Sequence, residues 1–399
     1  MSPSSANTAP LDIAIIGAGP GGLSAAHALA NRGFSVGIFD RAQVLHPIGA
    51  ALGLAEQGYA ALNAISPELS TQVHSKAINP KQQLLMRPNG EVLFADESPM
   101  AGTSFTWLGW FTLQSCLYKA LPNSVQLNLN HTLTEFMSDQ LDTPICLKFL
   151  NQANQFARIV VGADGYRSVV RNKTVGDGPP LYTGTMTWRG TVPRNNLVPL
   201  EEPFIGGAGF QLVVGEQKNF WMMDAGADQI AWGGTAPQGS SEKSKSTLDT
   251  ALRVFENWPS IVQTMIRATD PLSIIETGVY DRKPVSQWGD GQRITLLGDA
   301  AHPIRPSLGL GTTLALQDAV TLAEMLDAVT LTDITSVSAA LTRYEQTRIE
   351  ITTPLQKKAS EQGLASHADD QADRLKIGFE AALASRKKIT LALALSNPK

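Results

Sequence analysis

The segment Gly17-Ala18-Gly19-Pro20-Gly21-Gly22 has the spacing G-x-G-x-x-G and lies between an apolar stretch, 13–16, and a helix-like pattern that follows Gly22. In such a segment Gly17 permits a tight turn, Gly19 lets a pyrophosphate approach the backbone, and Gly22 lets helix and strand pack closely. The phosphates would sit at the helix N-terminus, where free N–H groups and the helix dipole favour anions. The segment predicts a dinucleotide site.

An acid follows the next predicted strand and bears on which nucleotide is bound. Asp40 ends the apolar stretch 36–39, where a carboxylate accepts hydrogen bonds from ribose hydroxyls. A ribose 2′-phosphate beside this carboxylate would be repelled, so the pattern disfavours NADP in this pocket. FAD and NAD both remain compatible with the residues.

A second motif, residues 162–171, follows the predicted strand 158–161 and opens a helix. Asp164 and Gly165 lie at the turn, and Ser168 and Arg171 fall on the first turns of that helix. The residues support two interpretations equally: a cofactor-related site, or a helix capped by Asp164 with Arg171 as a surface charge.

A third motif runs from Leu297 to Thr313 and contains Asp299, His302 and the pair Gly309 and Gly311. Asp299 could bind polyol hydroxyls, and the backbone of 309–311 could press N–H groups against a flat ring. The same pattern also fits an ordinary loop between a strand and a helix, with His302 as a hydrogen-bonded loop residue.

The elements that must position these motifs predict an α/β protein in which a Rossmann-like domain carries an inserted antiparallel sheet. Residues 11–181, together with 277–335, would form the Rossmann-like domain. Residues 182–276 would form the inserted lobe, because short apolar and aromatic segments there are broken by Gly, Asp and Asn. Residues 336–399 would be largely helical. The segment 53–121 predicts mostly helices and loops, with an Asn-Gly hairpin near residues 87–92.

Composition narrows the class of protein further. The 399 residues are 43% hydrophobic and 17% charged, with a net charge of −4 and no basic block, which excludes nucleic acid as an expected partner. Two cysteines give neither a disulfide framework nor metal-ligand spacing. The N-terminus lacks the pattern of a signal peptide, and no stretch is apolar enough to span a bilayer, so we expect a cytoplasmic protein. The tail 374–395 could touch a membrane surface, although packing on the protein itself is the simpler interpretation.

In this order and over residues 12–326, the three motifs together resemble the group A flavoprotein monooxygenases, near the subgroup of salicylate hydroxylase, urate hydroxylase and zeaxanthin epoxidase. The resemblance implies non-covalent FAD, with NADH or NADPH as the reductant. It also implies roles for individual positions: Gly17, Ala18, Gly19, Gly21 and Gly22 at the pyrophosphate, Asp40 and Arg41 at the ribose, Gly49 near the ring, Asp164 and Arg171 in the second fingerprint, Asp299 at the ribityl chain, and Gly309, Leu310, Gly311, Thr312 and Thr313 at the flavin's pyrimidine edge.

The resemblance also points to the catalytic end of the site. Arg189, in Trp188-Arg189-Gly190, would be an electrostatic partner of the flavin or the substrate, and Pro306 would shape the ring pocket. The apolar residues of the inserted lobe could line a substrate pocket or belong to an ordinary core: Phe210, Phe220, Trp221, Met222, Met223 and Trp232.

Three positions depart from the family pattern. Trp110 stands where an FAD-binding arginine is usual, and Leu310 and Thr313 replace a glutamine and an asparagine. These changes put the affinity for FAD in question without touching the three glycines.

The implied activity is transfer of one oxygen atom from O2, through a flavin C4a-hydroperoxide, to an aromatic or polyene small molecule; the protein binds, orients and excludes water, and no metal is needed. Two alternatives stay open: an FAD-linked reductase or dehydrogenase on the same scaffold, and a non-catalytic flavin binder. The residues name neither the substrate nor the oligomeric state.

Overall fold

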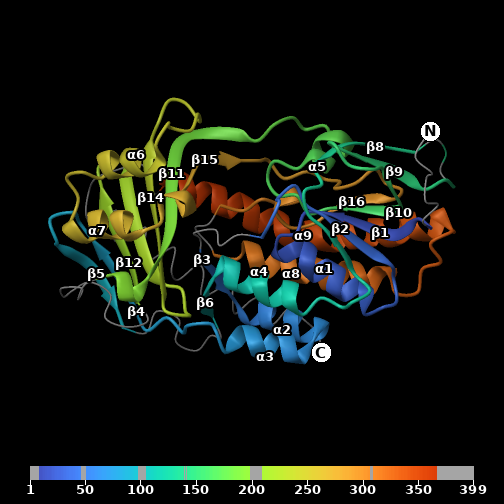
Figure 1. Ribbon diagram of the computed structural model, residues 1–399, viewed down its shortest axis with the longest axis horizontal. Coiled ribbons are helices and arrows are strands. Elements are labelled where there is room, and N and C mark those ends of the chain that lie inside the picture. Colours follow the sequence, from blue (N-terminus) through green and yellow to red (C-terminus); the bar gives the residue numbers. More distant parts are fainter. Residues whose placement is uncertain are drawn as a thin grey trace.

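A computed structural model describes residues 9–45, 51–97, 105–138, 140, 142–197, 209–305 and 309–365. For residues 362–365 only the backbone is described. Figure 1 shows an elongated molecule with one β-sheet toward each end and several helices packed between and below them. The predicted α/β class with an inserted antiparallel sheet is confirmed.

The first sheet is parallel from β7 to β10 and continues at one end with two antiparallel strands, β9 and β8. Its strands run in the order β7-β2-β1-β10-β9-β8, and β16 pairs with the second half of β10. Their bounds are β1 (Leu11–Ile16), β2 (Val36–Phe39), β7 (Gln126–Asn128), β8 (Leu133–Met137), β9 (Ile145–Phe149), β10 (Gln155–Gly162) and β16 (Ile294–Leu296). β1 is apolar apart from Asp12, and five of its six residues are buried, as expected for a strand covered on both faces.

The parallel pairing decides where the three motifs meet. β2, β1, β10 and β16 all run in the same direction, so their carboxyl ends lie at one edge of the sheet. Asp40, the glycine segment 17–22, Asp164 and Asp299 each follow one of these ends. Ligands of open α/β sheets bind at this edge, so the topology gathers every predicted motif into one place.

Helices cover this sheet and open the motif loops. α1 (Pro20–Ala30) begins directly after the glycine turn, with Pro20 at a position where the missing N–H costs nothing. α8 (Gly311–Leu326) contacts α1, α2 (Glu56–Ile65) and α9 (Ile334–Ala365). The remaining helices on this side are α3 (Pro67–His74), α4 (Trp110–Lys119) and α5 (Val169–Thr174). A small antiparallel pair, β3 (Ala51–Leu54) and β6 (Thr106–Gly109), lies toward the second sheet.

The second sheet has the order β15-β11-β14-β13-β12-β4-β5 and is antiparallel except between β12 and β4. Its bounds are β4 (Gln82–Met86), β5 (Val92–Asp96), β11 (Leu181–Pro193), β12 (Gly209–Gly215), β13 (Lys218–Asp224), β14 (Gln229–Pro237) and β15 (Ile275–Asp281). Two helices, α6 (Thr247–Val254) and α7 (Ser260–Ala268), cover its outer face (Figure 1).

The second sheet extends beyond the segment predicted for it. β4 and β5 form the predicted Asn-Gly hairpin, but they join this sheet although residues 53–121 were expected to be mostly helices and loops. β15 likewise reaches past residue 276. β4 and β5 join the second sheet because β4 pairs with β12. These two strands are more than a hundred residues apart, so the pairing leaves no local sequence signal.

Candidate functional site

The glycine segment is packed tightly everywhere except above Gly19. Gly17 has φ +113°, and a Cβ placed there would lie 2.3 Å from the Ala163 carbonyl oxygen. A Cβ on Gly22 would lie 2.0 Å from the Gly17 oxygen, whereas one on Gly19 would meet no atom within 4 Å. Within the part of the chain that the structure describes, the segment therefore leaves open space beside Gly19 at the N-terminus of α1, and no side chain there caps the helix.

Two side chains from other elements hold this segment. The Ala18 N–H donates to Asp40 Oδ2 at 2.6 Å, and Gln114 Nε2 of α4 donates to the Ala18 carbonyl at 2.8 Å. The second oxygen of the Asp40 carboxylate accepts from the Ala42 N–H. Arg41, predicted at the ribose, is exposed. Gln114 was missed as a site residue, since a lone buried glutamine on a helix carries no motif.

The Asp164 carboxylate caps the start of α5. It accepts from the Val169 N–H at 2.6 Å and from the Ser168 hydroxyl, while Ser168 itself accepts from the Arg171 N–H. Burial raises the pKa of Asp164 more than these hydrogen bonds lower it. Among the described residues, the hydrogen bonds of Asp164 are therefore those of a helix cap, in agreement with the capping interpretation.

Arg171 is not the surface charge that one interpretation expected, because none of its side chain is exposed. Its guanidinium donates to Asp177, to the Ala300 and Ala301 carbonyls, and to the Lys283 carbonyl. Asp177 also pairs with Arg282. Every nitrogen of Arg171 is engaged inside the protein, so this residue fixes the turn that follows Asp299.

Asp299 and the start of α8 face each other. The Asp299 side chain is accessible to solvent on one side. Protein atoms fill most of the space around its carboxylate, and the resulting desolvation raises the pKa of Asp299. A Cβ on Gly311 would lie 3.9 Å from Asp299 Oδ1. Among the described residues, no side chain caps the α8 N-terminus, where Gly309 has φ +66°. Free N–H groups beside an accessible carboxylate suit a ligand that carries both acceptors and hydroxyls.

The departures from the family pattern have structural roles. Leu310 is fully buried between the two lobes, and the Thr313 hydroxyl accepts from the Ala55 N–H at 3.1 Å. Both side chains hold the start of α8 against its surroundings and leave its backbone free. Thr312 and Gly311 are half-buried beside them. Trp110 is the first residue of α4 and packs against the core of the first lobe.

A buried charged cluster lies behind Asp299. Asp318 of α8 accepts from the Gly298 N–H at 2.8 Å, contacts His302 Nε2 at 2.6 Å, and accepts from Arg348 Nε at 2.6 Å. Burial alone raises the pKa of Asp318, but the neighbouring charges of His302 and Arg348, together with these hydrogen bonds, lower it to about 2. His302 is therefore a loop-positioning residue, as the simpler interpretation held.

Arg189 lies on the inner face of the second sheet. Trp188 belongs to the core cluster under α6 and α7, so its neighbour Arg189 points to the opposite face. Arg189 Nε is buried without a hydrogen-bond partner among the described residues, and desolvation lowers the pKa of this arginine.

The apolar residues predicted for the inserted lobe divide between the two faces of its sheet. Phe220, Met222 and Trp232 belong to the outer core under α6 and α7. Phe210, Trp221 and Met223 instead join the inter-lobe cluster, whose other members include Phe105, Trp107, Leu310 and Leu314. Half of the candidates are thus ordinary core, and half face the start of α8.

Two site predictions fall outside the described residues, namely Gly49 and Pro306, as does the tail 374–395.

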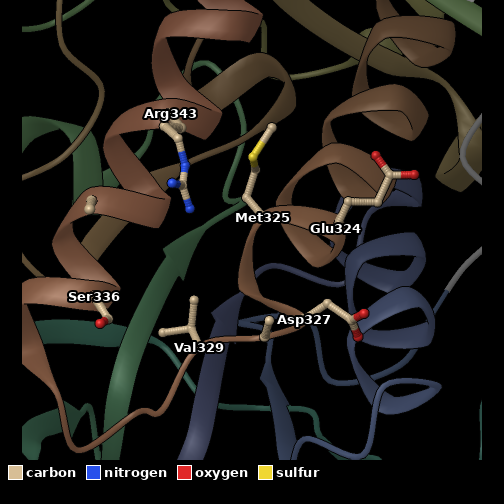
Figure 2. A pocket seen from close by; sticks show the side chains of 8 residues that line it. Glu324, Met325, Asp327, Val329, Ser336 and Arg343 are labelled. Atoms are coloured by element: carbon tan, nitrogen blue, oxygen red, sulfur yellow. The ribbon is translucent and has the colours of Figure 1, made fainter.

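The described residues form a pocket of about 420 Å³ between the end of α8 and the start of α9. It is lined by Glu324, Met325, Asp327, Ala328, Val329, Ser336, Ala339 and Arg343 (Figure 2). It sits at the opposite end of α8 from Gly311, roughly 24 Å away along a helix of this length. It is therefore remote from the motifs.

The comparisons with a family model and with curated relatives agree on one family. Residues 10–359 match the family described as FAD binding domain. The chain is 30% identical to a 3-amino-4-hydroxybenzoate 2-monooxygenase of Streptomyces cremeus, covering 90% of this chain and 88% of the relative. It is 28% identical to an aurachin C monooxygenase/isomerase of Stigmatella aurantiaca, covering 85% of both. It spans only about half the length of the zeaxanthin epoxidases it matches, 52% for that of Oryza sativa.

Solved structures show the same fold. Klebsiella pneumoniae HpxO complexed with FAD and uric acid has a TM-score of 0.78 at 24% identity, covering 95% of this chain and 97% of that one. A salicylate hydroxylase substrate complex has a TM-score of 0.71 at 20% identity, covering 96% and 98%.

The described residues fit FAD. The open space above Gly19 and the uncapped N-terminus of α1 suit a pyrophosphate, and Asp40 at the end of β2 suits a ribose. The accessible Asp299 carboxylate suits a polyol chain, and the free N–H groups at the start of α8 suit the carbonyl edge of a flat ring. The side chains of two of the departures, Leu310 and Thr313, are buried in contacts of their own.

Proposed function

The chain belongs to the FAD binding domain family, and from that membership we propose that it is an FAD-dependent monooxygenase, driven by NADH or NADPH, that acts on an aromatic or polyene small molecule. Its relatives are FAD-dependent monooxygenases, and the chain is an oxidoreductase by that kinship. The observation that carries the proposal is the convergence of Asp40, the glycine segment, Asp164 and Asp299 at one edge of the parallel sheet.

Bound FAD would take electrons from the reduced nicotinamide and activate O2, so that one oxygen atom reaches the substrate and the other leaves as water. The chain's own task is to hold and orient. Gly17, Gly19 and Gly22 would seat the pyrophosphate, while Asp40 and Asp299 would accept hydrogen bonds from the ribose and the ribityl chain.

The second lobe would supply the substrate side of the site. Trp107, Phe210 and Met223 pack with Leu310, at the start of α8, in an apolar cluster between the lobes. Apolar surroundings beside the flavin would exclude water, which favours oxygen transfer over the unproductive release of peroxide. Arg189 lies on the inner face of the second sheet and adds a positive charge there.

None of the described helices is both long and apolar enough to cross a membrane. The cytoplasmic location and the membrane contact of the tail stay predictions, and so does the choice between NADH and NADPH.

The first experiment is the visible absorption spectrum of the purified protein, before and after addition of FAD and desalting. We expect retained flavin bands, followed by substrate-stimulated oxidation of NADH or NADPH with incorporation of isotopically labelled O2 into the product. Oxidation of the nicotinamide without incorporation would establish the FAD-linked reductase or dehydrogenase instead. A protein that stays colourless after FAD addition would refute flavin-dependent catalysis altogether.

A further inference from the structure

The end of β15 is where the chain crosses from the second lobe back to the first. Asp281 is the last residue of β15, and β16, the next strand along the chain, belongs to the first sheet. β15 itself pairs with β11 of the second sheet. Any segment of the first lobe that binds Asp281 or the following Arg282 is therefore tied directly to the second sheet.

Arg282 fixes this strand end to two other segments. Its buried guanidinium donates to the Tyr166 carbonyl at 3.0 Å and to Asp177 at 2.7 Å. Its own carbonyl accepts from Gln356 Nε2 of α9 at 2.8 Å. Because buried hydrogen bonds to charged groups are costly to break, the end of β15 is a rigid support.

The Asp281 carboxylate joins this support to the third motif. Its Oδ2 accepts from Arg305 Nε at 3.1 Å and lies 2.8 Å from Arg305 Nη2. Its Oδ1 accepts from the Ser360 hydroxyl of α9 at 3.1 Å. The Arg305 and Asp281 side chains are only 10% and 20% exposed, so water and salt screen the pair weakly. Two donors from one planar guanidinium restrict its direction as well as its distance.

Residues 302–305, the loop of the third motif, are thus held by both lobes. At the start of the loop His302 contacts Asp318, in the buried cluster of the first lobe. Three residues later Arg305 binds the end of β15. Between them Ile304 packs against the inter-lobe cluster, which also contains Leu310 at the start of α8. The position of β15 therefore bears on the loop and on the helix that follows it.

The two ends of FAD would depend on different supports. The pyrophosphate and the ribose are assigned to the glycine segment and to Asp40, at the ends of two neighbouring strands of the first sheet. The flavin ring is assigned to the free N–H groups at the start of α8. A disturbance of residues 302–305 should therefore turn the ring without releasing the adenosine end.

We propose that Arg305 is a positioning residue that sets the flavin ring relative to the second lobe. Through its ion pair with Asp281, the loop of the third motif keeps a fixed place against the end of β15, and the start of α8 keeps its place with the loop. This inference rests on the proposed function, since it assigns how that site holds its FAD. It adds that the orientation of the ring, rather than the affinity for FAD, depends on this ion pair.

The test compares Arg305→Met with the unmodified protein through three measurements. Amide hydrogen exchange of the apoprotein should become about tenfold faster in peptides that cover residues 302–305 and the start of α8, because local opening there becomes easier. The visible circular dichroism of bound FAD should change in amplitude, because the ring sits differently in its asymmetric surroundings. The Kd of FAD should change less than about threefold, since the adenosine end is anchored independently.

Further variants separate the ion pair from general loosening. Asp281→Asn should reproduce both changes in the unmodified background and add little in the Arg305→Met background, as for two residues that act as one pair. Arg305→Lys should recover part of the dichroism, because an ammonium can still reach the carboxylate with one donor. Arg194→Met is the matched control. It breaks the ion pair with Asp224 beyond the other end of β11 and should leave the exchange and the dichroism unchanged.

Unchanged exchange and dichroism in an Arg305→Met protein that retains FAD would overturn the inference alone. So would an effect of Asp281→Asn that is equally large in both backgrounds, or the same changes in Arg194→Met. A large loss of FAD affinity in Arg305→Met would mean that this residue holds the cofactor rather than orienting its ring. If the unmodified protein retained no FAD, the proposed function itself would fall, and this inference with it.

Discussion

At the scale of single residues, the glycines of the first motif are needed for different reasons. Gly22 is required by the fold, because a Cβ there would collide with the Gly17 carbonyl oxygen at 2.0 Å. Gly19 has open space around it, so a methyl group there disturbs only a bound ligand. The two positions therefore separate folding from cofactor binding.

Gly19→Ala should leave the free energy of unfolding of the apoprotein within about 0.5 kcal/mol, as for surface substitutions away from packed features. It should weaken FAD binding by at least tenfold, because the methyl group occupies the place of the pyrophosphate. Gly22→Ala should lower the stability by roughly 1–3 kcal/mol through overpacking. Urea unfolding of the apoprotein and titration of FAD fluorescence measure the two effects. Unchanged FAD affinity in Gly19→Ala would place the pyrophosphate elsewhere.

The residues that carry motifs could be located from the sequence because each motif follows from backbone requirements that only a few residue types meet. Gln114, Arg305 and Asp318 could not, since their roles depend on partners 96, 24 and 16–30 positions away. The contacts of Leu310 and Thr313 were equally hidden, because their partners are also distant in the sequence. As departures from the family pattern, these two residues put the affinity for FAD in question, whereas the structure gives both side chains buried contacts of their own.

At the scale of elements, Arg171 links three segments through one buried guanidinium. It joins α5 to Asp177, to the turn at 300–301 and to the Lys283 carbonyl. Arg171→Met leaves Asp177 with Arg282 only and leaves two buried carbonyls without a donor. We expect a loss of about 3–5 kcal/mol, as for a broken buried ion pair.

Arg171→Lys should recover little of this loss, because an ammonium cannot reproduce the planar fork that contacts Asp177 with two nitrogens. Arg167→Met, on the exposed side of the same segment, serves as the control. Thermal unfolding of the three variants, with and without FAD, distinguishes them. A fully stable Arg171→Met would mean that Arg282 alone holds the turn.

The Asp318 cluster predicts a pH dependence of stability. The pKa of Asp318 is lowered to about 2 from a model-compound value of 3.8, so the folded state favours the ionised carboxylate. A depressed carboxylate pKa stabilises the fold above pH 4, and this contribution, roughly 2 kcal/mol, is lost as the pH falls from about 4 to about 2.

Asp318→Asn removes this titration. The difference in unfolding free energy between the unmodified protein and the variant should be largest above pH 4 and should shrink below it. Apparent Tm values at pH 6 and pH 3 measure the difference. Glu350→Gln, at an exposed position on α9, is the control for general effects of acid. A difference that stays constant between these pH values would contradict the assigned pKa.

Elements could be predicted where their hydrophobic period was local. The strand at 13–16 and the helix at 312–326 were predicted close to their observed bounds, since the apolar positions are buried as their spacing requires. β4 and β5 were not placed in the second sheet. Residues 82–96 carry no local signal for the parallel partner β12, which the chain reaches only after strands β7 to β10 of the first sheet.

At the scale of the whole molecule, the site lies where two separately packed lobes meet. The inter-lobe cluster joins Phe105 and Trp107 to Met223 of the second sheet and to Leu310 of α8. A Cβ on Gly53 would lie 2.2 Å from the Phe105 ring and 3.0 Å from the Gly309 carbonyl oxygen. The packing between the lobes thus sets the position of the loop that opens α8, which no single lobe could fix alone.

This arrangement predicts that the lobe interface and FAD binding are coupled. FAD at a hundredfold excess over its Kd should stabilise the unmodified protein by about 2.7 kcal/mol, because it binds the folded state only. Phe105→Ala should cost about 3–5 kcal/mol and should also reduce the gain from FAD, since the Gly309 loop loses its support. Phe255→Ala removes an equally buried ring from the outer core under α6 and α7 and should cost as much while keeping the full gain. Tm measured over a series of FAD concentrations separates the two, and an equal gain in both variants would mean that the interface packs the lobes without positioning the flavin site.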